Sequence, residues 1–348
     1  MKRKILYPIF LLLALICFDK ILLIPKFNEC CIKGSSIQVF RIDSSSFTNL
    51  REDYNILKKD NKKVILNIGS SLSHGFYYSE DERFVKNNNL VKDKDFFQKL
   101  GFINQPIPGS TSLSYFVRLN LLLDSGIRPD YILLEVAPHT FNSNTIWYYY
   151  ESREAINLEL LKNHFFEVKP EDLILTIQSN LFLSSYTPIG RVSYFEDISK
   201  KYFKLFIDAD KVVIKNFPFQ IYQTSKQTIF EALERGKSNF DISDKFKNYQ
   251  IDEGLKFYLK SSITRLKKEN IKFVLWYPKV QENVYVTHQR SYGSEWDKYV
   301  DQELSKENYI NMNEEKDSHC DYFIDPMHSG IQCFGELITI LKNKNLIQ

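Results

Sequence analysis

The sequence predicts an α/β domain, a mostly parallel sheet with helices on both faces. From residue 61 onward, short apolar runs of strand length alternate with longer amphipathic stretches, and this alternation is typical of parallel sheets. Polar loops follow several of the strands directly, at the edge of a parallel sheet where active sites lie. With 348 residues, of which 43% are hydrophobic, the chain is long enough for one large domain or two smaller ones.

Each expected element has the length and the pattern of its type. The strands are short runs rich in Ile, Leu and Val, whereas the helices are longer and carry apolar residues at helical spacing. The expected strands are residues 63–68, 101–104, 130–136 and 271–276, and the expected helices are residues 112–125 and 252–269. Together they place the α/β domain at residues 61–348.

Residues 145–250 interrupt this alternation. Their pattern is largely helical, and aromatic residues cluster at 147–150 and 217–219. We therefore expect a mostly helical insertion between the third and fourth core strands. Two alternatives stay open, a cap over the active site or helices that widen the core, because pockets and cores share an apolar composition.

Residues 1–26 are expected to form an N-terminal transmembrane anchor. Lys2, Arg3 and Lys4 precede an apolar run, and residues 5–24 would span roughly 30 Å as a helix, about the thickness of a bilayer core. Basic residues ahead of a span keep the N-terminus in the cytoplasm, and no small-x-small cleavage site follows closely. The sequence thus predicts a single-pass inner-membrane protein whose domain faces the periplasm. Residues 27–60 would form a juxtamembrane lead-in with one strand-like run.

Composition and the positions of the cysteines limit which ligands and cross-links the chain is expected to have. Lys and Arg number 46 against 43 Asp and Glu, and no basic run alternates with aromatic residues, so nucleic acid is not an expected partner. Cys320 and Cys333 lie close together near the C-terminus; in an oxidising compartment they would form a disulfide, and the alternative is two buried thiols. His319 beside Cys320 is a weak metal signal. We expect neither a metal nor a cofactor.

Two short motifs about 250 residues apart carry the expected chemistry. Gly-Ser-Ser at residues 69–71 follows the first strand, and Asp-Pro-Met-His at residues 325–328 lies near the C-terminus. A serine hydroxyl is a weak nucleophile until a base takes its proton, and a histidine is a dependable base when a carboxylate orients it. We therefore expect Ser71 as the nucleophile, His328 as the base and Asp325 as the orienting acid.

These motifs resemble those of the SGNH/GDSL hydrolase superfamily. Ser71 matches the family's nucleophile and Ser70 replaces its usual Asp, a form similar to the membrane-anchored DltD-like branch, which works in D-alanylation of teichoic acids. Gly109 lies in a block similar to the family's glycine block, whose backbone N–H helps to bind the oxyanion. The resemblance covers roughly residues 61–145 and 250–340 and implies an SGNH-like, flavodoxin-like sheet. The chain is also similar to an uncharacterised spirochaete family with the same anchor and motifs.

The third motif departs from the general family pattern. After the strand at 130–136, His139 stands where the family usually has an Asn that donates to the oxyanion, whereas the Pro-x-x-Phe run at 138–141 is shared with the DltD-like branch. His139 is therefore a candidate oxyanion or substrate-binding residue, and a hydrogen-bonded loop histidine is the alternative. Glu135, inside the same apolar strand, would need a polar partner if it is buried.

Taken one at a time, the candidate residues have ordinary structural explanations. Ser71 would be a solvated turn serine, His328 a surface or capping histidine, and Asp325 a helix N-cap. Their order along the chain and their placement at strand ends favour a triad. His74, three residues after Ser71, more readily lines the mouth of the site than acts as the base.

The resemblance implies a membrane-anchored serine acyltransferase that moves an O-acyl group, acetyl or aminoacyl, on or off an envelope glycan or lipid. Its expected partner, by the same resemblance, is a membrane-bound O-acyltransferase. Two alternatives stay open: an esterase or deacetylase with the same triad, and a non-catalytic assembly or binding protein of the cell envelope on the same scaffold. Convergence of Ser71, His328 and Asp325 in space separates the enzymes from the binding protein.

Overall fold

Five parallel strands form a single sheet, as the alternation of strands and helices predicts. The strand order is β2-β1-β3-β4-β5, which is the order of flavodoxin-like doubly wound sheets. The strands are β1 (Lys63–Gly69), β2 (Leu100–Pro106), β3 (Tyr131–Glu135), β4 (Lys272–Tyr277) and β5 (Tyr309–Asn311). The computed structural model describes residues 2–19, 46–73, 93–107, 109–145, 148, 151–152, 155–181, 249–304, 308–320, 323, 327–329 and 332–348.

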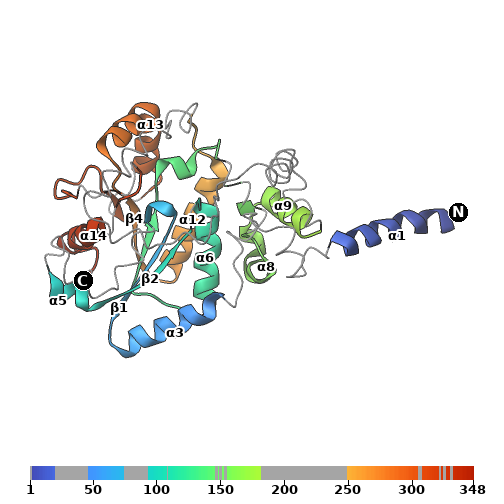
Figure 1. The fold of residues 1–348 in the computed structure, drawn as a ribbon, viewed down its shortest axis with the longest axis horizontal. Coiled ribbons are helices and arrows are strands. Elements are labelled where there is room, and N and C mark those ends of the chain that lie inside the picture. The colour runs from blue at the N-terminus through green and yellow to red at the C-terminus, as the bar shows by residue number, and fades with distance from the viewer. Residues whose placement is uncertain are drawn as a thin grey trace, which may run out of the picture.

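Helices cover both faces of the sheet, because successive strand residues point to opposite faces and both sets are apolar. In β1, Val64, Leu66 and Ile68 pack in one core cluster, and Ile65 packs in the other. Figure 1 shows α6 (Ser112–Asp124) and α12 (Glu253–Lys268) on one side of the sheet and α5 (Lys94–Gln98) and α14 (Gln332–Asn343) on the other. The remaining described α-helices are α1 (Lys2–Asp19), α3 (Ser46–Lys59), α8 (Leu158–His164), α9 (Pro170–Leu181) and α13 (Glu282–Gln302).

Local signals in the sequence set the helix starts. The Thr111 side chain caps α6 by accepting from Leu113 N. Asp252 caps α12 by accepting from the backbone N–H groups of Gly254 and Leu255, which satisfies donors that the first helical turn leaves without partners. The expected helices at 112–125 and 252–269 are confirmed, and the four expected strands match β1 to β4 within a few residues.

Several elements were not expected from the sequence. Helix α3 occupies part of the segment read as a juxtamembrane lead-in, and Leu50, Tyr54 and Leu57 pack against the core. Helices α13 and α14 and the three-residue strand β5 complete the C-terminal part of the sheet and its layers. The strand-like run at 36–40 lies outside the described residues.

The described part of the segment 145–250 is helical and packs on the core. Leu160 of α8 is fully buried in the main core cluster. Tyr258 of α12 donates to Asp172 of α9 over 2.6 Å and accepts from Lys169 N over 3.1 Å. Residues 182–248 lie outside the described residues. Helices α8 and α9 therefore extend the layer that α6 and α12 form.

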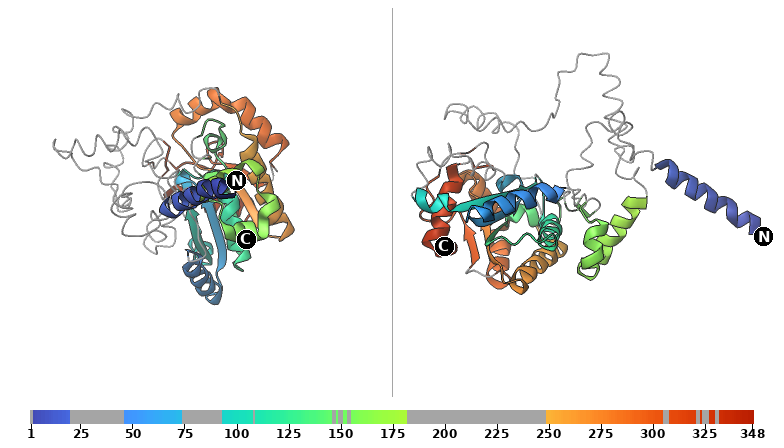
Figure 2. Two further views of the ribbon diagram at one scale, coloured as in Figure 1. Left: turned by 90° about the vertical axis from the view of Figure 1, so that its right-hand side faces the viewer. Right: turned by 90° about the horizontal axis from the view of Figure 1, so that it is seen from below.

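The expected anchor falls partly on described residues. Helix α1 ends at Asp19, and Figure 2 shows it set apart from the sheet and its layers. Residues 20–45 lie outside the described part of the chain. Among the helices that the structure describes, none is long and apolar enough to cross a membrane.

Candidate active site

Ser71 and His328 are brought together at the carboxyl end of the sheet. His328 Nε2 lies 2.9 Å from Ser71 Oγ, although 257 positions separate the two residues. Both side chains are half-buried, so each is held by the protein and reachable from outside. A neutral imidazole at this distance can accept the serine proton as the hydroxyl attacks an electrophile.

The turn that carries Ser71 is organised by a buried carboxylate. Glu135, the last residue of β3, accepts hydrogen bonds from Ser70 N (2.9 Å), from Ser73 N (3.0 Å) and from the Ser70 hydroxyl. These are the polar partners that a buried Glu135 requires. A Cβ on Gly69 would stand 2.6 Å from Glu135 Oε2 and would also meet Ser73 Oγ. Only glycine therefore allows the carboxylate to lie against this turn.

A second loop, which contains Gly109, lies against the Ser71 turn. Ile107 N donates to Gly69 O over 2.9 Å, which joins the loop to the end of β1. Gly109 has φ = 78°, a conformation that a residue with a Cβ rarely adopts. Glu151 holds the far side of the loop by accepting from Thr111 N over 2.6 Å and from the Thr111 hydroxyl.

The two loops share a buried electrostatic environment. Burial raises the pKa of Glu135 and raises the pKa of Glu151 to about 7. Burial, followed by the nearby charges of Glu135 and Glu151, raises the pKa of Tyr115 well above its usual value. The neutral Tyr115 hydroxyl donates to Ser110 O of the Gly109 loop over 3.4 Å and also interacts with the Ser70 side chain of the Ser71 turn.

Two nested closures hold the loop that carries His328. An antiparallel bridge pairs Phe323 with Ser329, and a disulfide joins Cys320 to Cys333 with Cα atoms 5.3 Å apart. The disulfide, rather than two thiols, is the alternative that the structure supports. Asp325 lies outside the described residues, as does His74, so their expected roles stay predictions.

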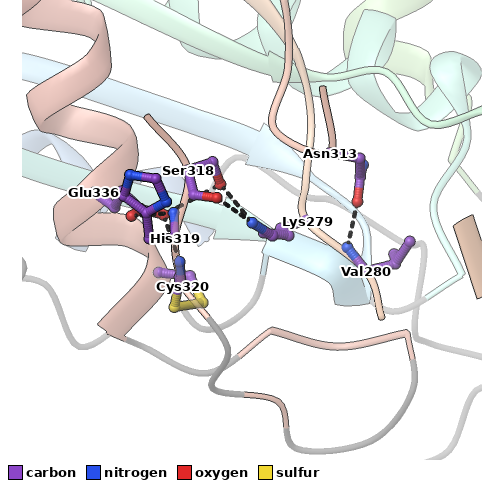
Figure 3. Close-up of a disulfide and its surroundings, with 8 residues drawn as sticks. Lys279, Val280, Asn313, Ser318, His319, Cys320 and Glu336 are labelled. Atoms are coloured by element: carbon purple, nitrogen blue, oxygen red, sulfur yellow. Dashed lines mark hydrogen bonds between the residues drawn. A yellow bond between two sulfur atoms is a disulfide. The ribbon is translucent and has the colours of Figure 1, made fainter. Parts of the chain in front are cut away.

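Glu336 of α14 fixes the start of the closed loop. Its buried carboxylate accepts from His319 N (2.6 Å), Cys320 N (3.0 Å) and the Ser318 hydroxyl (3.2 Å). Lys279, just after β4, donates to the backbone O of Ser318 and to its hydroxyl. Figure 3 shows these bonds meeting beside the disulfide. The loop is thereby attached to a helix on one side and to the end of a strand on the other.

The neighbours of Ser71 and His328 share one apolar cluster. Leu72 follows Ser71, Met327 precedes His328, and both are buried with Ala137 and Tyr277 at the ends of β3 and β4. Close-packed side chains move little relative to one another. The cluster therefore fixes the position of Ser71 relative to His328.

His139 lies in the short 3₁₀ helix η3 (Pro138–Phe141) after β3. Its ring centroid is 6.4 Å from that of His288, a fully buried residue whose Nδ1 lies 2.8 Å from Tyr277 Oη. Burial lowers the pKa of His288 to about 3, so His288 is neutral. His139 thus lies beyond the carboxyl end of β3, at the same edge of the sheet as Ser71. Its expected role towards the oxyanion or the substrate stays a prediction.

Sequence reasoning missed the buried carboxylates Glu151 and Glu336. The sequence contains one signal for Glu336: it is an acidic residue in the mostly apolar run of α14, which indicates a buried carboxylate that needs polar partners. Glu151 follows a run of aromatic residues, and nothing nearby in the sequence indicates that its partner is Thr111, 40 positions away. Among the described residues, no group of three or more His, Cys, Asp or Glu is placed to hold a metal ion.

Comparison with known proteins adds a family but no activity. A search of curated proteins finds no match. The family model described as "Protein of unknown function (DUF1574)" matches residues 1–344, which include the N-terminal helix, every described strand, Ser71 and His328. The chain therefore belongs to the DUF1574 family.

Proposed function

We propose that this protein is a membrane-anchored, SGNH-like serine acyltransferase that acts on an O-acyl group of an envelope glycan or lipid. Ser71 attacks the acyl carbonyl, the ester C–O bond breaks, and the acyl group remains on Ser71. His328 takes the serine proton and passes it to the departing oxygen, while Asp325 orients the imidazole. The backbone N–H groups of Ser71 and Gly109 stabilise the oxyanion. An acceptor hydroxyl then takes the acyl group.

The observation that supports this proposal is the 2.9 Å separation of His328 Nε2 and Ser71 Oγ. A surface histidine and a turn serine, which are the ordinary alternatives, have no physical reason to meet from opposite ends of the chain. Here, four sets of interactions hold Ser71 and His328 in place: the Glu135 hydrogen bonds, the shared apolar cluster, the Glu336 hydrogen bonds and the disulfide. Such a supported pair is the arrangement that nucleophilic catalysis requires.

The membrane anchor and the periplasmic location are part of the same proposal. The Cys320–Cys333 disulfide favours an oxidising compartment, and the basic residues before the apolar N-terminal run favour a cytoplasmic N-terminus. A membrane-bound O-acyltransferase as the acyl donor is proposed by resemblance alone.

An esterase or deacetylase is the second candidate function. An esterase would use the same residues. The half-burial of Ser71 and His328 favours hydrolysis, because water can reach side chains that the protein does not fully cover. The two functions differ only in the molecule that removes the acyl group from Ser71.

Acyl-enzyme trapping tests the proposal. We expect para-nitrophenyl acetate to acetylate the peptide that contains Ser71, and the Ser71→Ala and His328→Ala variants to lose this acetylation, read by mass spectrometry. Equal acetylation of the Ser71→Ala variant would remove the nucleophile assignment. Adding envelope glycan to the acetylated enzyme then separates the functions: acetylated glycan indicates transfer, and free acetate at an unchanged rate indicates hydrolysis.

A further inference from the structure

We propose that Glu135 is a positioning residue that holds the Ser71 turn in its reactive geometry. The inference rests on the proposed function of Ser71 and extends it to a residue that does not touch the reacting atoms. Glu135 ends β3, and its carboxylate is completely buried beneath the turn.

The contacts of Glu135 fix the turn on both sides of the nucleophile. Ser70 precedes Ser71, and Ser73 lies two residues after it; Glu135 accepts from the backbone N–H of each, over 2.9 and 3.0 Å. The turn cannot rotate about Ser71 without breaking one of these bonds. The Cα–Cβ bond of Ser71 thus keeps one direction, from which Oγ lies 2.9 Å from His328 Nε2.

The sequence around Ser71 is matched to this carboxylate. The Ser70 hydroxyl donates to Glu135 Oε1, whereas an Asp at position 70 would bring a second carboxylate against the first in a buried site, at a large electrostatic cost. Gly69 is matched as well, because it has no Cβ, and a Cβ at this position would lie 2.6 Å from Glu135 Oε2. The conformation of residues 69 to 73 therefore depends on Glu135 of the neighbouring strand β3.

Three donors and no acceptor face Glu135 in these contacts. A carboxylate satisfies all three, because an ionised carboxylate is an acceptor only. In a glutamine of the same shape, the carbonyl oxygen can take the place of Oε2, which accepts from both backbone N–H groups. The NH₂ group then faces the Ser70 hydroxyl, which must turn from donor to acceptor, and the negative charge that strengthens all three bonds is lost. Glu135→Gln is therefore a near-isosteric change that weakens the two backbone contacts and reverses the third.

Asp172 provides a matched control. It is also a buried carboxylate, at 3% exposure, and accepts from Tyr258 Oη (2.6 Å) and Tyr148 Oη (3.0 Å) in the layer formed by α9 and α12. Asp172→Asn thus removes a buried, hydrogen-bonded charge that does not contact the Ser71 turn.

The test compares the full-length Glu135→Gln and Asp172→Asn variants with the unmodified protein. With para-nitrophenyl acetate, we expect Glu135→Gln to lower kcat at least about tenfold while KM changes less than about twofold, because small misplacements of a nucleophile are costly. Asp172→Asn should leave both constants within about twofold. Ser70→Ala, which removes one of the three contacts, should lie between them. A kcat of Glu135→Gln equal to that of Asp172→Asn would overturn the proposal.

Amide hydrogen exchange of residues 69–73 gives a second readout that does not need turnover. We expect faster exchange at Ser70 and Ser73 in Glu135→Gln and unchanged exchange in Asp172→Asn. If the unmodified protein is not acetylated at Ser71, the proposed function fails, and exchange alone decides on Glu135. Unchanged exchange in Glu135→Gln would then overturn its positioning role.

Discussion

At the scale of single residues, reactivity depends on whether one imidazole nitrogen faces one hydroxyl. His328 Nε2 meets Ser71 Oγ, so the other nitrogen, Nδ1, is the one that an acid must orient. A carboxylate at Nδ1 keeps the proton there and stabilises the imidazolium that forms. Asp325, three positions before His328, is the residue expected to supply it.

Substitution of Asp325 tests this expectation. We predict that Asp325→Asn leaves the protein folded but lowers kcat for para-nitrophenyl acetate by about 10³–10⁴, because the imidazole would adopt the wrong tautomer. Thermal unfolding of the variant checks the fold. A loss of less than about tenfold would mean that another group orients His328.

A second residue-scale prediction concerns Glu151 and pH. Burial raises the pKa of Glu151 in the folded chain from 4.5 to about 7. In the unfolded chain the carboxyl ionises at lower pH, so its ionisation favours unfolding as pH rises. Its contribution to stability is fully present below about pH 4.5 and is lost as pH rises to about 7.

We therefore expect the unmodified protein to lose roughly 3 kcal/mol of unfolding free energy relative to Glu151→Gln between about pH 4.5 and about pH 8. Denaturant unfolding of both proteins at the two pH values measures this difference. A difference that stays constant with pH would show that Glu151 titrates normally.

At the scale of elements, the site is assembled from three strand ends and one closed loop. The ends of β1 and β3 supply the Ser71 turn and Glu135, and the end of β2 leads into the Gly109 loop. The His328 loop comes from the C-terminal part of the chain and is fastened to α14 and to Lys279. The sequence predicts the strand ends well, because each strand is a continuous apolar run bounded by polar residues.

The Cys320–Cys333 disulfide gives an element-scale prediction. Closing this loop lowers the entropy of the unfolded chain, so Cys320→Ser with Cys333→Ser should lower stability by about 3 kcal/mol. The loop that holds His328 would also be freer, and acetylation of Ser71 should slow. Cys17→Ser is the control, because Cys17 is exposed and forms no disulfide with any cysteine in the described part of the chain. Alkylation of both Cys320 and Cys333 before reduction, read by mass spectrometry, would contradict the prediction.

At the scale of the whole molecule, local patterns predict the sheet but not all that surrounds it. The strands β1 to β4 and the helices α6 and α12 follow from apolar periodicity and from the caps Thr111 and Asp252. Strand β5 has only three residues, and a segment of this length is too short for its apolar pattern to distinguish a strand from a loop. The pairs Glu135–Ser70 and Glu151–Thr111 join residues 65 and 40 positions apart, so no local pattern contains them.

Membrane topology is the whole-molecule prediction. We expect residues 1–4 to stay in the cytoplasm and residues 27–348 to face the periplasm, because basic residues precede the apolar run. Alkaline phosphatase fused after residue 348 should be active, and the intact N-terminal peptide should be recovered from the membrane fraction. A mature N-terminus that begins after Cys17 would contradict the anchor.

The central claim is that Ser71 is a nucleophile activated by His328, and a fluorophosphonate probe tests it most directly. The probe reacts with activated serines, and mass spectrometry locates the adduct. The account predicts a single adduct on Ser71 that is lost in both Ser71→Ala and His328→Ala, while Ser70→Ala retains it at a lower rate. Undiminished labelling of the Ser71→Ala variant, or none in the unmodified protein, would contradict it.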